Sequence, residues 1–171
     1  MIKFVGNYES IIPASWIPHM NQCTGEIRPN SRMVMTPEVK ETQEQWRQAG
    51  YVEGSAATWE LFHDWDFTEQ IDMTKFDFCK GKKVQWWISK VVPGHCFPIH
   101  VDTVKEDLIN PKRYWIALND YKWGHVFLVE DTCLRDYKKG DAFEFANIPH
   151  GAANVGLENK YSLQMLVSDL E

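Results

Sequence analysis

The sequence predicts a mainly β fold of the jelly-roll type, with flanking helices contributed by the N-terminal part. From Lys83 onward the chain consists of short β-type runs separated by Gly, Pro and Asn-Asp turns. The runs AFEF and KYSLQML alternate with a period of two, so one face of each strand points into a core or cavity. Helix signals occur only in the first 82 residues. We therefore expect a single domain over residues 1–171, in which a mixed helical and β part (1–82) supports a β core (83–171).

The N-terminal part carries two helix signals. The first begins at Thr36, an N-cap residue followed by proline at the first helical position, and ends at Gly50. The second is a short helix, since offsets of three, four and seven would place four residues on one face: Trp59, Phe62, His63 and Asp66.

The C-terminal part contains the predicted strands in chain order. They are VQWWISKVV, CFPIHVD, RYWIALND, HVFLVE, AFEFAN, AANVG and KYSLQMLV. Alternation within the first run means that one of Trp86 and Trp87 faces inward, where it could line a substrate entrance.

Composition excludes several classes of partner. The net charge is −6 and the basic residues are scattered, so nucleic acid is an unlikely partner. No uncharged apolar run approaches the length of a membrane span. The four cysteines form no CxxC pair and the N-terminus lacks the apolar core of a secretory signal. We expect a soluble, cytoplasmic protein with free thiols; the sequence does not predict its oligomeric state.

A candidate metal site comes from two short motifs. His100 and Asp102 are two residues apart at a predicted strand end, so both point to the same face. His150, after a later strand, can supply a third ligand. Two imidazoles and one carboxylate form the facial triad of non-heme Fe(II) oxygenases, although the same set with water would also suit zinc. The alternative is that each histidine is an ordinary hydrogen-bonded structural residue.

A lysine on the last strand indicates an anionic ligand. Lys160 and Ser162 share the polar face of that strand. An ammonium inside a barrel is costly unless an anion meets it. A carboxylate held by these two residues, at the far end of a molecule that chelates iron, describes 2-oxoglutarate. The alternative is that Lys160 lies near the strand end and reaches solvent.

The segment from about Val84 to Ser168 resembles the 2-oxoglutarate/Fe(II)-dependent oxygenases. Their pattern of HxD, distal His, a basic residue about ten positions later and a nearby Ser matches the five residues described above. The run GDAFEFANIPHGAANVGLENKYSLQM is similar to the aspartyl/asparaginyl and free-proline hydroxylase branch. There a second arginine contacts the cosubstrate, and Arg113 is the nearest match. In that branch arginine is commoner at the position of Lys160. A lysine ammonium is a point charge and cannot hold the cosubstrate carboxylate through two parallel hydrogen bonds as a guanidinium does.

This resemblance implies a double-stranded β-helix core, cupin-like in architecture, that uses Fe(II), 2-oxoglutarate and O2. 2-Oxoglutarate is decarboxylated to succinate and CO2, and a C–H bond of the substrate is oxidised, usually by hydroxylation. The implied metal ligands are His100, Asp102 and His150, with Lys160, Ser162 and Arg113 as cosubstrate-binding residues. The implied prime substrate is a small molecule or peptide: a free amino acid or an amino-acid side chain in a peptide.

Two rival functions stay open at this point. One is a cupin-type metal enzyme that does not use 2-oxoglutarate, although cupins usually have HxH. The other is a metal-free β-barrel binding module. Two further residues have alternative interpretations. Asn154 orients the distal strand or is a turn residue, and His125 supports the site or is an exposed strand residue.

Overall fold

The computed structural model describes residues 2–29, 58–102 and 108–170, together with single positions 37, 41, 44, 45 and 48. The helix predicted between Thr36 and Gly50 falls almost wholly outside these residues and stays a prediction. In the described part, no helix is long and apolar enough to cross a membrane.

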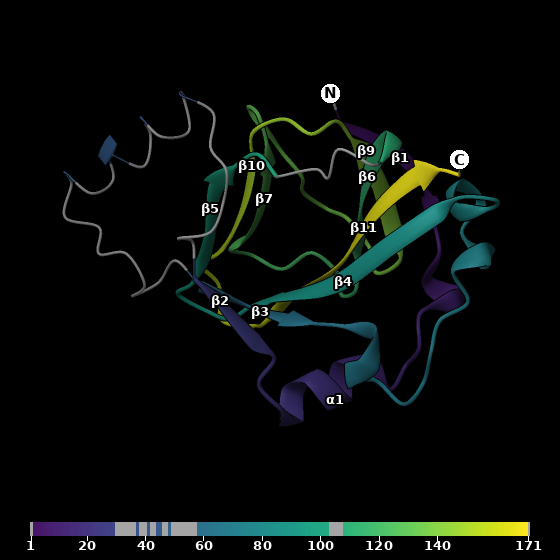
Figure 1. Ribbon diagram of the computed structural model, residues 1–171. Helices are drawn as coiled ribbons and strands as arrows, with labels where there is room; N and C mark the ends of the chain where they lie inside the picture. The colour runs from purple at the N-terminus through teal and green to yellow at the C-terminus, as the bar shows by residue number, and fades with distance from the viewer. Residues whose placement is uncertain are drawn as a thin grey trace.

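The fold is mainly β, as predicted, and consists of two antiparallel sheets that face each other (Figure 1). The large sheet contains, in spatial order, β1 (Ile2–Asn7), β9 (Asp141–Phe145), β6 (Ile109–Ala117), β11 (Lys160–Asp169), β4 (Lys83–Val91), β3 (Thr58–Phe62) and β2 (Glu26–Pro29). The small sheet contains β5 (Cys96–His100), β10 (His150–Asn154), β7 (His125–Val129) and β8 (Thr132–Cys133). The seven predicted strand runs all occur as strands.

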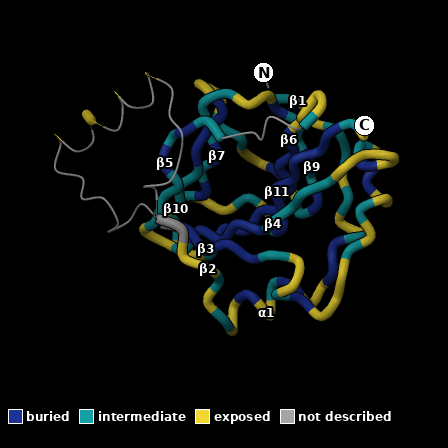
Figure 2. The backbone as a smooth tube through the Cα atoms, viewed as in Figure 1, coloured by how far each residue is buried: buried dark blue, intermediate teal, exposed yellow. Residues whose placement is uncertain are grey.

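Alternation along the strands divides the large sheet into two faces. On β11, Leu163 and Met165 point to an outer core that also contains Trp16 and Met20 of helix α1 (Trp16–Gln22). The outer layer also includes four 3-10 turns: Glu9–Ile11, Asp64–Asp66, Met73–Lys75 and Asp77–Cys79. Figure 2 shows that the buried chain is concentrated in the central strands, whereas α1 and the outer loops carry much of the exposed chain. The inner face of the large sheet therefore meets the small sheet.

The short helix predicted at Trp59–Asp66 is wrong. Residues Thr58–Phe62 form β3, paired with both β2 and β4, and only Asp64–Asp66 is a 3-10 turn. Because β3 is covered on both faces, Trp59 and Phe62 are both buried, although they point in opposite directions. A strand buried on two faces can reproduce the apolar spacing of a helix.

Two further features of the fold agree with the sequence. Trp86 stacks on Trp16 in the outer core while Trp87 lines the inner cavity, so only one of the adjacent pair faces inward. The four cysteines are all free thiols.

Candidate metal centre and cavity

The three predicted ligand residues lie together between the two sheets. His100 ends β5, His150 begins β10, and the two are direct partners in the antiparallel pairing of these strands. Asp102 follows β5 by two residues. One nitrogen from each imidazole and one carboxylate oxygen all lie within 4.8 Å of one another. One cation could therefore be reached by all three side chains.

A β-bulge in β5 places His100 opposite His150. Phe97 pairs with Ala152 and His100 pairs with His150, so β5 has one residue more than β10 between these two points. The bulge contains Pro98, which lacks a backbone N–H and is tolerated because β5 is an edge strand of the small sheet. Bulges of this kind re-aim a side chain at the rim of a sheet.

Both imidazoles are held by backbone carbonyls through the same nitrogen. Nδ1 of His100 lies 2.7 Å from the carbonyl oxygen of Pro98, and Nδ1 of His150 lies 2.8 Å from that of Ile148. A carbonyl can only accept, so Nδ1 carries the proton in each ring and Nε2 presents a lone pair. Nε2 of His100 is buried and has no hydrogen-bond partner in the part of the chain that the structure describes. The orphaned nitrogen fits a metal ligand.

Asp102 is fixed at both its side chain and its backbone. Its carboxylate forms an ion pair with the Arg113 guanidinium, and it lies 3.2 Å from Nε2 of His150 and 3.4 Å from Nε2 of His100. The Asn147 side-chain amide donates to the Asp102 carbonyl at 2.8 Å, and its oxygen accepts from the Asp102 N–H at 3.2 Å. These bonds orient the residue even though it lies beyond the end of β5.

The electrostatics keep the donor set in its metal-binding form. Burial raises the pKa of Asp102, whereas the Arg113 guanidinium beside it lowers the pKa, and the pKa lies well below its usual range. Burial lowers the pKa of His150. A carboxylate and two imidazoles with Nε2 lone pairs are donors that a divalent metal binds.

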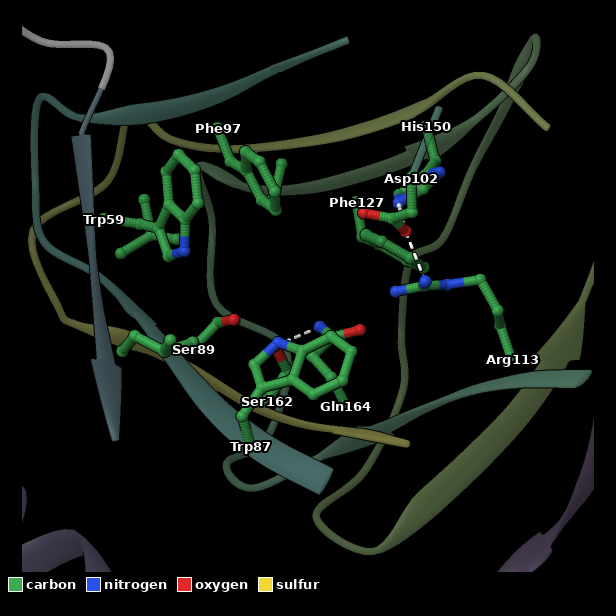
Figure 3. Close-up of a pocket in the computed structure, with 13 residues that line it drawn as sticks. Trp59, Trp87, Ser89, Phe97, Asp102, Arg113, Phe127, His150, Ser162 and Gln164 are labelled. Atoms are coloured by element: carbon green, nitrogen blue, oxygen red, sulfur yellow. Dashed lines mark hydrogen bonds and ion pairs between the residues drawn. The ribbon is translucent and has the colours of Figure 1, made fainter. Parts of the chain in front are cut away.

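A cavity of about 230 Å³ opens beside the triad (Figure 3). Its lining is mainly aromatic and aliphatic, with a few polar groups: Trp59, Leu61, Trp87, Ser89, Val91, Phe97, Asp102, Arg113, Phe127, His150, Ala152, Ser162 and Gln164. Nε2 of Gln164 donates to Oγ of Ser162 at 3.0 Å. Ser162, a predicted cosubstrate residue, therefore lines the same cavity as two of the three candidate ligands.

Lys160 is fully buried, so the alternative that it reaches solvent is wrong. It does not line the cavity itself, but its Nζ lies 5.5 Å from the ring centroid of Phe127, which does, and 4.9 Å from that of Trp115. Among the described residues no carboxylate lies within ion-pair distance of Nζ. Burial lowers the pKa of Lys160 to about 7. Lys160 is therefore a buried amino group with no counter-charge among the described residues.

Arg113 lies on the metal side of the cavity. It is buried, it pairs with Asp102, and its guanidinium carbon lies 5.6 Å from the ring centroid of Trp87 and 5.7 Å from that of Phe145. Its Nε forms no hydrogen bond with any residue that the structure describes. The structure therefore places Arg113 beside the triad, with one donor left over.

Two residues with alternative interpretations are now placed. His125 is buried and its Nε2 lies 3.0 Å from the Glu158 carbonyl oxygen, so it is not an exposed strand residue. Asn154 donates to the carbonyls of Val91 and Glu158 and accepts from the N–H of Gly156. It ties the end of β10 to the end of β4 and to the turn before β11.

Sequence reasoning missed most of the apolar cavity wall. The sequence predicts a helix at Trp59 and gives no role to Leu61, Ser89 or Phe97, all of which line the cavity. The missing signal was the alternation of β3 and β4, which puts Trp59 and Leu61, and likewise Trp87 and Ser89, on the inner face.

Comparison with known proteins finds solved structures of similar fold. No protein-family model and no curated protein sequence matches the chain significantly. Among solved structures, the viral collagen prolyl hydroxylase of Paramecium Bursaria Chlorella virus-1, in its 2OG complex, has a TM-score of 0.51 at 10% identity, covering 99% of this chain and 96% of that one. A Pseudomonas putida prolyl-4-hydroxylase has a TM-score of 0.48 at 12% identity, covering 92% and 99%. A predicted oxalate decarboxylase of Thermotoga maritima has a TM-score of 0.41 at 15% identity, covering 65% and 81%. At 10% identity, the similarity to the viral enzyme shows that the two chains share a fold.

Proposed function

We propose that this protein is an Fe(II)- and 2-oxoglutarate-dependent oxygenase that hydroxylates a free amino acid or an amino-acid side chain in a peptide. The observation that carries the proposal is the convergence of His100, Asp102 and His150 at one end of a cavity whose lining also includes Ser162. Lys160 on the same strand supports it, because its side chain is buried and no carboxylate of the described residues pairs with it.

Each group has a proposed role. His100, Asp102 and His150 hold the metal through two Nε2 atoms and one carboxylate. Lys160 and Ser162 hold the distal carboxylate of 2-oxoglutarate, and Arg113 contributes a further donor beside the metal. Bound iron would couple the conversion of 2-oxoglutarate and O2 to succinate and CO2 with hydroxylation of a substrate C–H bond.

The protein's own contribution is positioning and the exclusion of water. The carbonyls of Pro98 and Ile148 set both imidazole tautomers before any metal arrives. The apolar lining surrounds the open side of the triad with Phe97, Phe127 and Trp87, which favours a dry site.

Anaerobic titration tests this proposal. Fe(II) and 2-oxoglutarate added to the protein should produce the weak visible charge-transfer band of the bound chelate, and His100→Ala should abolish it. His19→Ala is the matched control, because His19 is an exposed residue of α1. Absence of the band and of 2-oxoglutarate affinity in calorimetry would overturn the proposal. Metal binding without 2-oxoglutarate binding would favour a cupin-type enzyme, and no metal binding would favour a binding module.

A further inference from the structure

The cavity has a second half that the proposed cosubstrate residues leave unused. Figure 3 shows Trp59, Phe97 and Ser89 on the side of the cavity away from Arg113. Trp59 comes from β3 of the large sheet and Phe97 from β5 of the small sheet, and their rings stack with centroids 3.8 Å apart. The Phe97 ring in turn lies 4.0 Å from that of His100. This aromatic wall therefore runs up to the candidate metal ligands.

The residues that line this half of the cavity disfavour charged ligands. Among the described lining residues, the one carboxylate is Asp102, which is already paired with Arg113. A cationic side chain entering beside Trp59 and Phe97 would meet no free carboxylate among the described residues, and an anionic one would have to leave water for an aromatic wall. An uncharged apolar side chain meets neither cost.

Ser89 supplies one unmet hydrogen bond beside this wall. Ser89 and Ser162 are direct partners on β4 and β11, and both line the cavity. Oγ of Ser162 accepts from Gln164, whereas Oγ of Ser89 is buried and has no hydrogen-bond partner among the described residues. Ser89 is only 3% exposed. A buried orphan hydroxyl is costly and is satisfied when a ligand brings a carbonyl or amide group.

We infer that the half-cavity beside Trp59 and Phe97 binds an uncharged apolar side chain of the prime substrate, while Ser89 hydrogen-bonds a backbone carbonyl or amide next to that side chain. The inference rests on the proposed function. It narrows the substrate class to amino acids or peptides with an apolar residue at the oxidised position.

Calorimetry with four probes tests the inference. N-acetyl-leucinamide, N-acetyl-prolinamide, N-acetyl-lysinamide and N-acetyl-aspartic acid amide are titrated into the anaerobic Fe(II)–2-oxoglutarate complex. The leucine and proline probes should bind at least about tenfold more tightly than the charged ones. Equal affinity, or a preference for the lysine or aspartate probe, would overturn the inference.

Two variants localise the binding. Ser89→Ala should weaken the apolar probes about tenfold while leaving 2-oxoglutarate affinity within about twofold. Trp59→Leu should also weaken them, and Trp123→Leu, at a residue 89% exposed, is the control. Equal loss of probe and 2-oxoglutarate affinity in Ser89→Ala would place Ser89 in the cosubstrate site and overturn the assignment.

The two proposals fail in different ways. If Fe(II) or 2-oxoglutarate does not bind, the proposed function fails. The probe titrations are then repeated on the metal-free protein, where a preference for apolar probes that Ser89→Ala removes still supports this subsite. No such preference there would overturn the subsite as well.

Discussion

His150 lies directly opposite His100 in the antiparallel pair of β10 and β5, with ring centroids 4.3 Å apart. Neither strand alone brings both rings to one point, because the sequence separates them by fifty residues. The pairing depends on the extra residue of the β5 bulge. Any change that removes the bulge would shift His100 off the register of His150.

Asp102→Asn should weaken metal binding and should also lower the stability of the metal-free protein. Metal affinity should fall by more than about a hundredfold, equivalent to about 2.7 kcal/mol, because the anionic ligand is lost. The free energy of unfolding without metal should fall by about 3 kcal/mol, since Arg113 is left as a buried charge without its partner. Calorimetry and urea unfolding measure the two effects.

A surface ion pair provides the control for that prediction. Lys112 pairs with Glu144 but is 58% exposed, so Lys112→Gln should change stability by less than about 0.5 kcal/mol. A metal-free Asp102→Asn protein as stable as the parent would contradict the role assigned to the Arg113 pair.

Lys160→Met should change how stability depends on pH. The pKa of Lys160 is about 7 when folded and about 10.4 in an unfolded chain, so between these values the unfolded state binds more protons. The free energy of unfolding therefore rises with pH between 7 and 10. Below pH 7 Lys160 is charged in both states, and the buried charge destabilises the fold in full. The advantage of Lys160→Met should be largest below pH 7 and shrink towards pH 10.

Urea unfolding at several pH values between 6 and 10 measures this difference. Lys122→Met is the control, because Lys122 is about half exposed and pairs with Glu158 at the surface. Its stability difference from the parent should stay constant over the range. Parallel curves for Lys160→Met and the parent protein would show that Lys160 does not titrate as expected.

Binding of 2-oxoglutarate should take up protons above pH 7. A carboxylate beside Lys160 favours the ammonium form and raises the pKa of Lys160. The neutral fraction of Lys160 in the free protein must therefore take up a proton on binding. Calorimetric enthalpies at pH 8 should then differ between Tris and phosphate buffers. Lys160→Arg should show no such difference, because arginine is charged throughout. Buffer-independent enthalpies for the parent would argue against Lys160 as the partner.

Gly140→Ala should destabilise the fold more than Gly81→Ala. Both glycines have positive φ, +86° and +67°, but a Cβ on Gly140 would lie 2.2 Å from the Glu9 backbone nitrogen, whereas none of the described atoms lies within 4 Å at Gly81. The expected losses are at least about 3 kcal/mol and about 1 kcal/mol. Thermal denaturation of both variants measures these losses. Similar losses would mean that the turn before β9 can move away from Glu9 at little cost.

The pattern of the chain by itself determined seven strands of the C-terminal part, the inward direction of Lys160 and Ser162, and the grouping of His100 with Asp102. These follow from the period of two along an extended chain, which depends only on near neighbours. Their roles as ligands remain predictions that the titrations above test.

Only the tertiary structure decided the partners of those residues. The pairing of Arg113 with Asp102, the assignment of Trp59 to a strand and the cavity wall it forms with Phe97 all join segments far apart in the sequence. Such contacts depend on strand register and on which sheet each strand joins. Local periodicity does not specify either, because a strand buried on both faces and a short helix can share one apolar spacing.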